Sequence, residues 1–409
     1  MQLTNPRKPA VIFIFITIVL DMLALGMIIP VLPKLVVDFA GGNTAHGALI
    51  FGLFGTAWAL MQFIFSPLLG ALSDRYGRRR VILISNFGLG CDYILMALAP
   101  NLHWLFIGRI ISGITAASIS TAYAYIADVT PADKRAGAFG LLGAAFGLGF
   151  VLGPGLGGIL GSIDTHLPFW VAAGLSLLNA LYGWLVLPES LAPAKRSGFS
   201  WKRANPFGAL KLLREHTGLG GLAAVAFLSN LAHVVLPSTF VLYAGYRYGW
   251  NERDIGLTLA GVGVCSALVQ GCLVRPFVAR YGERTALLTG LSTGIIGFVI
   301  FGLAATGPVF LGGIIFSALW GFTGPAVQGL MTRRVGPSTQ GRLQGANSSL
   351  TGIAQMLGPT LFTHAFASFI DSPVAGNARG WHLPGAPFLL AGLILCCALG
   401  LAVHSSRAG

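Results

Sequence analysis

A short basic turn between two apolar stretches occurs twice in this chain, and it constrains the fold more than any other feature. The first copy runs from Gly70 to Arg80, and a weaker copy runs from Ala279 to Arg284. Arg75, Tyr76, Gly77 and Arg79 recur 205 residues later, half the 409-residue length, as Arg280, Tyr281, Gly282 and Arg284. A second segment keeps the same offset, because Gly147, Gly153 and Pro154 recur as Gly352, Gly358 and Pro359. One offset shared by two segments predicts an internal duplication whose halves have the same orientation.

The composition places this duplication in a membrane. The chain is 55% hydrophobic and 10% charged, whereas soluble domains carry about 25% charged residues. Apolar stretches of about 20 residues are long enough to cross a bilayer as helices. Twelve of them are expected, near 10–37, 46–72, 80–98, 102–126, 135–161, 167–187, 218–244, 254–279, 285–305, 308–332, 340–370 and 384–404.

The predicted fold is therefore an all-α polytopic membrane protein with twelve transmembrane helices in two six-helix halves. The expected boundaries are 1–187 for the N-terminal half, 188–217 for a basic linker and 218–409 for the C-terminal half.

The net charge of +13 is explained by topology and not by a nucleic-acid partner. All but five of the 26 Lys and Arg residues fall at the termini or in alternate loops; the five are Lys34, Arg109, Arg247, Arg253 and Arg379. Cytoplasmic loops of membrane proteins are enriched in these residues. Both termini are therefore expected in the cytoplasm, with the basic excess also available to anionic lipid.

Three charged residues lie deep inside predicted spans, away from their ends. Asp21 and Asp92 are each about 17 Å from the cytoplasmic end of their helices, at 1.5 Å per residue, and Arg109 lies in the fourth span. A charge at this depth costs at least about 2.5 kcal/mol unless it is paired, neutralised or hydrated. We expect Asp21 and Asp92 to bind protons or substrate, with Arg109 as a partner. A static structural role for each remains the alternative.

The first basic turn carries acids as well as bases. Asp74 lies beside Arg75, Arg78 and Arg79, and Asp128 precedes another basic turn. A network of these five side chains would latch one end of the bundle, which is a gate. The alternative, a turn that only sets topology, accounts for the arginines but not for Asp74.

The fifth predicted span is rich in glycine. Gly149, Gly153, Pro154, Gly157 and Gly158 put small residues at four-residue spacing, which permits close helix contact. This helix either lies between the halves or simply packs tightly.

Polar side chains are scattered through several other spans. Each is more often a hydrogen bond between helices than a ligand contact. Together they predict a cavity for an amphipathic, partly aromatic solute. The candidates are Gln62, Asn86, Asn230, His233, Gln270 and Asn347.

These segments resemble the major facilitator superfamily and, within it, the tetracycline–proton antiporters. The turn Gly70–Arg80, Arg109 with Gly113, and Gly149–Gly158 are similar to three motifs of drug–proton antiporters. Segments similar to tetracycline exporters are Leu20–Pro33, Asp92–Pro100, Tyr125–Asp128 and Leu343–Gly345. The resemblance implies coupling roles for Asp21, Asp92 and Arg109, gate roles for Asp74 and Asp128, and cavity positions for Gln62 and Gln270.

Two positions depart from that pattern. Tetracycline exporters carry an acid in the ninth helix and often a His in the eighth, where this chain has Gly294 and Ser266. Any proton coupling therefore rests on Asp21 and Asp92.

The sequence thus predicts a proton-coupled exporter of amphipathic, tetracycline-like drugs in the inner or plasma membrane. The expected partners are the solute, protons and lipid; no enzyme activity, cofactor, metal or nucleic-acid partner is expected. A proton-coupled importer of a metabolite and a non-transporting receptor or scaffold are the alternatives.

Overall fold

The structure, a computed structural model, describes residues 7–116, 119–131, 134–196, 210, 212–213, 218–336, 339–370 and 382–406. None of these residues lies in a β-strand. Helices satisfy every backbone hydrogen bond internally, which an apolar bilayer requires. The architecture therefore follows directly from the long apolar stretches of the sequence.

The described chain contains ten helical stretches that are long and apolar enough to cross a membrane. The longest, Glu252–Leu303, spans 52 residues and is broken at Gly282, whose φ of 81° is not helical. The helix Gln340–Phe369 is also long enough, although more polar. All twelve predicted spans thus coincide with one helix or with up to three consecutive helical elements.

The chain divides into two compact units. Unit 1 comprises Met1–Leu32, Ala57–Asn205 and Asn251–Ala260. Its helices are α1 (Arg7–Ile28), α4 (Arg78–Ala97), α5 (Leu102–Thr115), α6 (Ile119–Val129), α7 (Arg135–Gly161), α8 (Leu167–Val186) and η3 (Pro193–Lys195), together with parts of α3 (Thr44–Tyr76) and α12 (Glu252–Leu268).

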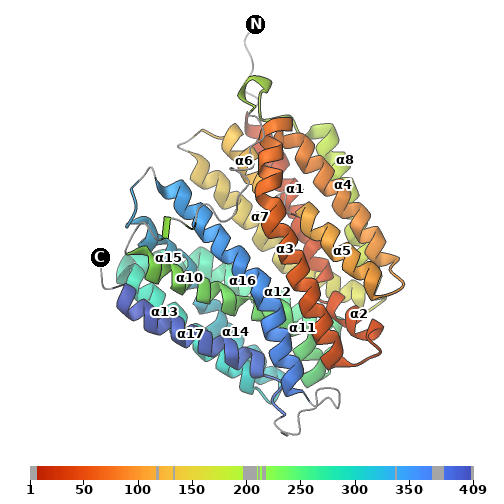
Figure 1. Ribbon diagram of the computed structural model, residues 1–409, viewed down its shortest axis with the longest axis vertical. Helices are drawn as coiled ribbons and strands as arrows, with labels where there is room; N and C mark the ends of the chain where they lie inside the picture. The colour runs from red at the N-terminus through yellow and green to blue at the C-terminus, as the bar shows by residue number, and fades with distance from the viewer. Residues whose placement is uncertain are drawn as a thin grey trace. The chain divides into compact units, whose positions relative to one another are not determined.

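The core of unit 1 forms where α1 packs on α7 and α8, and α4 packs on α8 and α5 (Figure 1). Aliphatic side chains dominate it, and Tyr125 is the large aromatic residue that they surround.

Unit 2 comprises Pro33–Thr56, Pro206–Trp250 and Gly261–Gly409. Its helices are α2 (Leu32–Phe39), α10 (Leu219–His233), α11 (Val235–Tyr248), η5 (Val269–Leu273), α13 (Val274–Leu303), α14 (Gly307–Leu319), η6 (Trp320–Phe322), α15 (Thr323–Thr332), α16 (Gln340–Phe369) and α17 (Ala386–Ser405).

Aromatic rings fill the core of unit 2. Phe301 and Phe310 stack with centroids 4.3 Å apart, and Tyr243 meets Phe388 edge-on at 5.0 Å. Such contacts add to area burial about 0.5–1.5 kcal/mol each. Stacked and edge-on aromatic pairs thus contribute to the stability of unit 2.

The same helix pairings recur in the two units. The pair α1–α7 corresponds to α10–α16, and α4–α8 corresponds to α13–α17. The duplicated turn also recurs in the backbone, since Gly77 and Gly282 both have positive φ, 103° and 81°. A side chain is strained in that conformation. The duplication predicted from the sequence is therefore present in the fold.

The predicted boundaries of the two halves and the linker, 1–187, 188–217 and 218–409, are not tested by this division and remain predictions. Parts of α3 and α12 are assigned to different units from the rest of their helices. Most of the predicted linker, including 197–209, lies outside the described residues.

Candidate functional site

Asp21 of α1 is held by amide side chains from two neighbouring helices. Asn179 of α8 donates from Nδ2 to Asp21 Oδ1 at 2.8 Å and to the Thr17 carbonyl oxygen at 2.9 Å. Asn86 of α4, in the amide orientation that suits its neighbours, donates to Asp21 Oδ2 at 3.2 Å. Both asparagines are fully buried. The Asp21 carboxylate therefore accepts hydrogen bonds from neutral amide groups in place of water. Neither of these donors carries a positive charge.

Asp92 of α4 is buried, with 1% of its surface exposed, and neither of its carboxylate oxygens has a hydrogen-bond partner. Arg109 of α5 attracts it electrostatically. The Arg109 guanidinium nevertheless lies over the Trp58 ring, 5.2 Å from the centroid, and its Nε has no hydrogen-bond partner. Among the described residues Asp92 and Arg109 thus attract each other without a direct hydrogen bond, and Arg109 as the partner of the acids stays a prediction.

These two acids give unit 1 a buried polar interior with unused hydrogen-bonding capacity. Several neighbouring hydroxyl groups are also buried without a partner: those of Thr17, Ser112, Thr121 and Ser176. Because an unpartnered buried polar group costs about 1–3 kcal/mol, a region with several of them is a candidate for function.

The remaining predicted cavity residues lie in both units, and two of those in unit 2 have hydrogen-bond partners within that unit. Asn230 Nδ2 donates to the Ala226 carbonyl of its own helix at 2.8 Å. Asn347 Nδ2 donates to Gln328 Oε1 at 2.6 Å. Gln270 is exposed within the π-helical turn η5, and Gln62 of α3 is partly buried in unit 1. Within unit 1, Asn86 is the predicted cavity residue that contacts a predicted acid.

His233 lies beside Trp320, with their rings 5.5 Å apart. A Cβ atom added at Gly294 would lie 2.9 Å from the ring of the same tryptophan. The indole therefore fills the space into which a side chain at 294 would project.

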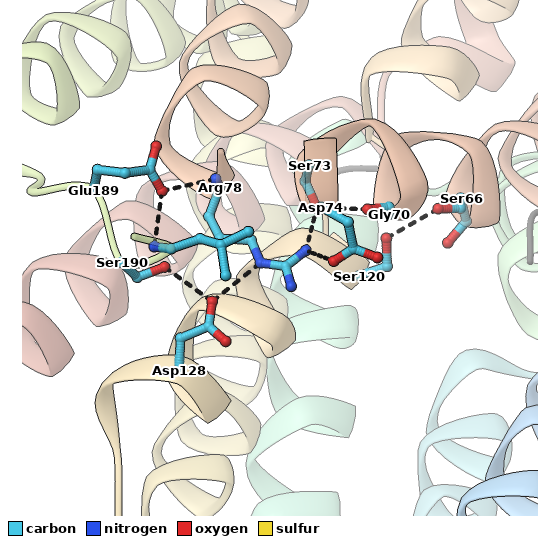
Figure 2. A network of polar contacts seen from close by, with 10 residues as sticks. Ser66, Gly70, Ser73, Asp74, Arg78, Ser120, Asp128, Glu189 and Ser190 are labelled. Carbon is cyan, nitrogen blue, oxygen red and sulfur yellow. Dashed lines mark hydrogen bonds and ion pairs between the residues drawn. The ribbon is translucent and has the colours of Figure 1, made fainter. Parts of the chain in front are cut away.

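The first basic turn builds the second polar cluster. Gly77 ends α3 and α4 begins at Arg78. Arg78 Nη1 lies 2.6 Å from Asp74 Oδ1, and its Nε lies 3.1 Å from Asp128 Oδ2. Nη1 also donates to Ser73 Oγ at 2.6 Å. Figure 2 shows Arg78 between these acceptors. Only 10% of its side chain is exposed. Asp74 and Asp128 thus both contact Arg78, and the gate formed by the five predicted residues stays a prediction.

Glu189, just after α8, joins this cluster and was not among the predicted gate residues. Its Oε1 accepts from the backbone N–H of Arg78 at 2.9 Å and from that of Leu191 at 3.1 Å (Figure 2). Ser190 donates to Asp128 Oδ2 at 3.1 Å. The first turn of α4 lacks an acid of its own, so Glu189 caps it from 111 residues away.

Two other predicted gate arginines lie outside this cluster. Arg79 Nη2 donates to the Trp184 carbonyl oxygen at the end of α8. Arg75 lies over the ring of its neighbour Tyr76, 5.2 Å from the centroid. Arg79 thus attaches the turn to α8, and Arg78 is the hub of the cluster.

The glycines of α7 let it pack closely against α1. A Cβ atom added at Gly153 would lie 2.7 Å from the Gly26 Cα atom. Added Cβ atoms at Gly149 and Gly157 would collide with Met22 and Met27. Gly158 faces another helix, since its added Cβ atom would collide with the Glu252 backbone of α12. Within unit 1 the packing role of this motif is therefore direct.

The chain matches the profile described as Major Facilitator Superfamily over residues 14–359. This chain belongs to the Major Facilitator Superfamily. It is 37% identical to the class C tetracycline resistance protein of Escherichia coli, covering 93% of this chain and 95% of the relative. It is 38% identical to the class G protein of Vibrio anguillarum, covering 92% and 93%.

Solved structures agree on the fold. The human organic anion transporter MFSD10 superposes with a TM-score of 0.71 at 24% identity, covering 98% of this chain and all of that one. A bacterial homologue of the lysosomal transporter Spinster reaches 0.77 at 19% identity, covering 99% and 98%. The predicted all-helical fold of two six-helix halves is confirmed.

Proposed function

We propose that this chain exports tetracycline-like amphipathic drugs across the inner or plasma membrane in exchange for protons. The observation that carries the proposal is 35–38% identity to several tetracycline resistance proteins over most of the chain. The buried acids of unit 1 supply the chemistry that proton exchange needs.

Asp21 and Asp92 would have different roles in proton exchange, because their neighbouring side chains differ. The Asn179 and Asn86 amides hold Asp21 in place and can donate to its charged form. Asp92 lacks such donors and depends on Arg109 for charge compensation. Protonation of Asp92 would remove its electrostatic attraction for Arg109, whose charge would then favour an anionic or polar edge of the drug.

The cluster around Arg78 would act as the gate at the end of the bundle that carries the basic turns. It ties α3, α4, α6 and the segment after α8 within unit 1. On this proposal both termini lie in the cytoplasm and the gate closes that side of the transport path. Gln62, Asn230, His233, Gln270 and Asn347 would contribute neutral contacts to the solute.

The test is transport in everted membrane vesicles from a host lacking its own drug exporters. Tetracycline added to energised vesicles should release protons and accumulate inside, and cells carrying the chain should gain tetracycline resistance. Asp21→Asn with Asp92→Asn should remove both effects while the protein remains in the membrane. Transport by the double variant at the parent's rate would contradict the assignment of coupling to these acids.

A panel of unrelated hydrophobic compounds tests the substrate separately. Resistance confined to compounds without fused rings would reject tetracyclines as substrates and leave drug export standing.

A further inference from the structure

One ion pair occupies equivalent positions in the two repeats with its charges exchanged. Arg78 pairs with Asp128 at 3.1 Å. The residues 205 positions later are Glu283 and Arg333, and Arg333 Nη2 lies 3.0 Å from Glu283 Oε1. Each pair joins the residue after a positive-φ glycine, Gly77 or Gly282, to the end of a neighbouring helix. The duplicated backbone thus keeps the contact and reverses its polarity.

Helix termini favour the polarity of the second pair. Glu283 begins the helical segment after Gly282, and Arg333 directly follows the last residue of α15. Acids are stabilised at helix N-termini and bases at helix C-termini. The first pair has the opposite arrangement, because Arg78 begins α4 and Asp128 lies one residue before the end of α6.

The two pairs also differ in the number of additional polar partners around them. Arg78 has the further acceptors Asp74 and Ser73, and Glu189 caps the helix start beside it. In the second repeat the position of Asp74 is taken by Ala279. Among the described residues Glu283 has Arg333 as its ion-pair partner, and its Oε2 is buried without a hydrogen bond. Extra acids therefore fix the polarity of the first pair, whereas among the described residues the polarity of the second pair is favoured only by the weaker effect of its helix termini.

We propose that Glu283 and Arg333 are positioning residues of the second repeat, a static bracket that holds the turn at Gly282 against the end of α15. A bracket needs only opposite charges, so exchanging its two residues preserves it. The Arg78–Asp128 pair belongs to a network in which Asp74 and Glu189 require a positive charge at position 78. Exchanging Arg78 and Asp128 therefore disrupts that network.

The experiment is a pair of matched charge swaps in the full-length protein. Glu283→Arg, Arg333→Glu and their combination are compared with Arg78→Glu, Asp128→Arg and their combination. Thermal unfolding of each purified variant requires no substrate, and initial rates of tetracycline uptake into vesicles provide the second measurement. The uptake measurement rests on the proposed function, whereas the unfolding measurement is independent of it.

Each single change at 283 or 333 should lower the melting temperature by about 1–3 °C and reduce the maximal uptake rate several-fold. The KM for tetracycline should stay unchanged, because the bracket does not touch substrate. The double swap should recover most of both losses. The double swap at 78 and 128 should recover neither, since a glutamate at 78 would face Asp74 and Glu189.

Two results would overturn the proposal. One is a 283/333 double swap that melts no higher than its worse single variant. The other is a 78/128 double swap that recovers as completely as the 283/333 swap. If the parent protein takes up no tetracycline, the proposed function is wrong. The melting temperatures of the variants still test whether Glu283 and Arg333 form a static bracket.

Discussion

Replacing Gly153 by alanine tests whether α1 and α7 are in contact as closely as the structure indicates. The added Cβ atom would lie 2.7 Å from the Gly26 Cα atom and 3.1 Å from the Leu23 carbonyl oxygen. Carbon atoms are in optimal contact at about 3.5–4.0 Å. The two helices must therefore separate by roughly 1 Å, because both of these neighbours are backbone atoms that cannot rotate away.

The size of the effect follows from two opposing terms. Overpacking of this kind costs about 1–3 kcal/mol, whereas exchanging glycine for alanine in a helix gains about 1 kcal/mol. Gly147 lies on the same helix, and an added Cβ atom there meets nothing within 4 Å. Gly147→Ala therefore shares the gain and lacks the clash, so the difference between the variants isolates the clash at about 1–3 kcal/mol.

Thermal unfolding of the two purified variants, followed by circular dichroism, measures this difference. Gly153→Ala should melt about 2–6 °C below Gly147→Ala, with the parent protein at or slightly below the Gly147 variant. Equal melting temperatures for the two variants, or a more stable Gly153→Ala, would refute the close contact between α1 and α7.

Three further changes test individual contacts. Glu189→Ala should impair tetracycline uptake more than Glu189→Gln, which keeps an acceptor for both backbone N–H groups; equal uptake would reject the cap. Asn179→Ala should slow proton-driven uptake, whereas Ser176→Ala, also buried but without a partner, should not; matching rates would remove the amide from coupling. Gly294→Asp should lower the melting temperature through collision with Trp320, and an unchanged value would show that the indole moves aside.

The sequence predicted the fold because the relevant signals are local and repeated. Each apolar stretch identifies a helix without reference to the others, and the constant offset relates the halves. Asp21 and Asp92 could be found in the same way, since a charge within an apolar span is visible in a single window.

The partners of these charges could not be predicted in this way. Asn179 reaches Asp21 from 158 residues away, and nothing in either local sequence selects that pair from the other polar residues in spans. Glu189 had a usable signal, as an acid in an otherwise basic segment. Its target, the unfulfilled N–H groups at the start of α4, becomes apparent only when α8 ends beside that helix.

Comparing the two repeats shows whether the fold itself requires the buried polar residues of unit 1. The positions 205 residues after Asn86, Asp92 and Arg109 are Leu291, Gly297 and Ile314, and all three are buried in unit 2. The same backbone arrangement is therefore stable with apolar residues at the positions that carry the charges in unit 1. A charge at this depth costs at least about 2.5 kcal/mol. The charged residues of unit 1 are therefore less favourable for stability than the apolar residues at the same positions of the second repeat. Packing does not account for their presence, whereas binding of a proton or a polar solute does, and this favours function over a static role for Asp92 and Arg109.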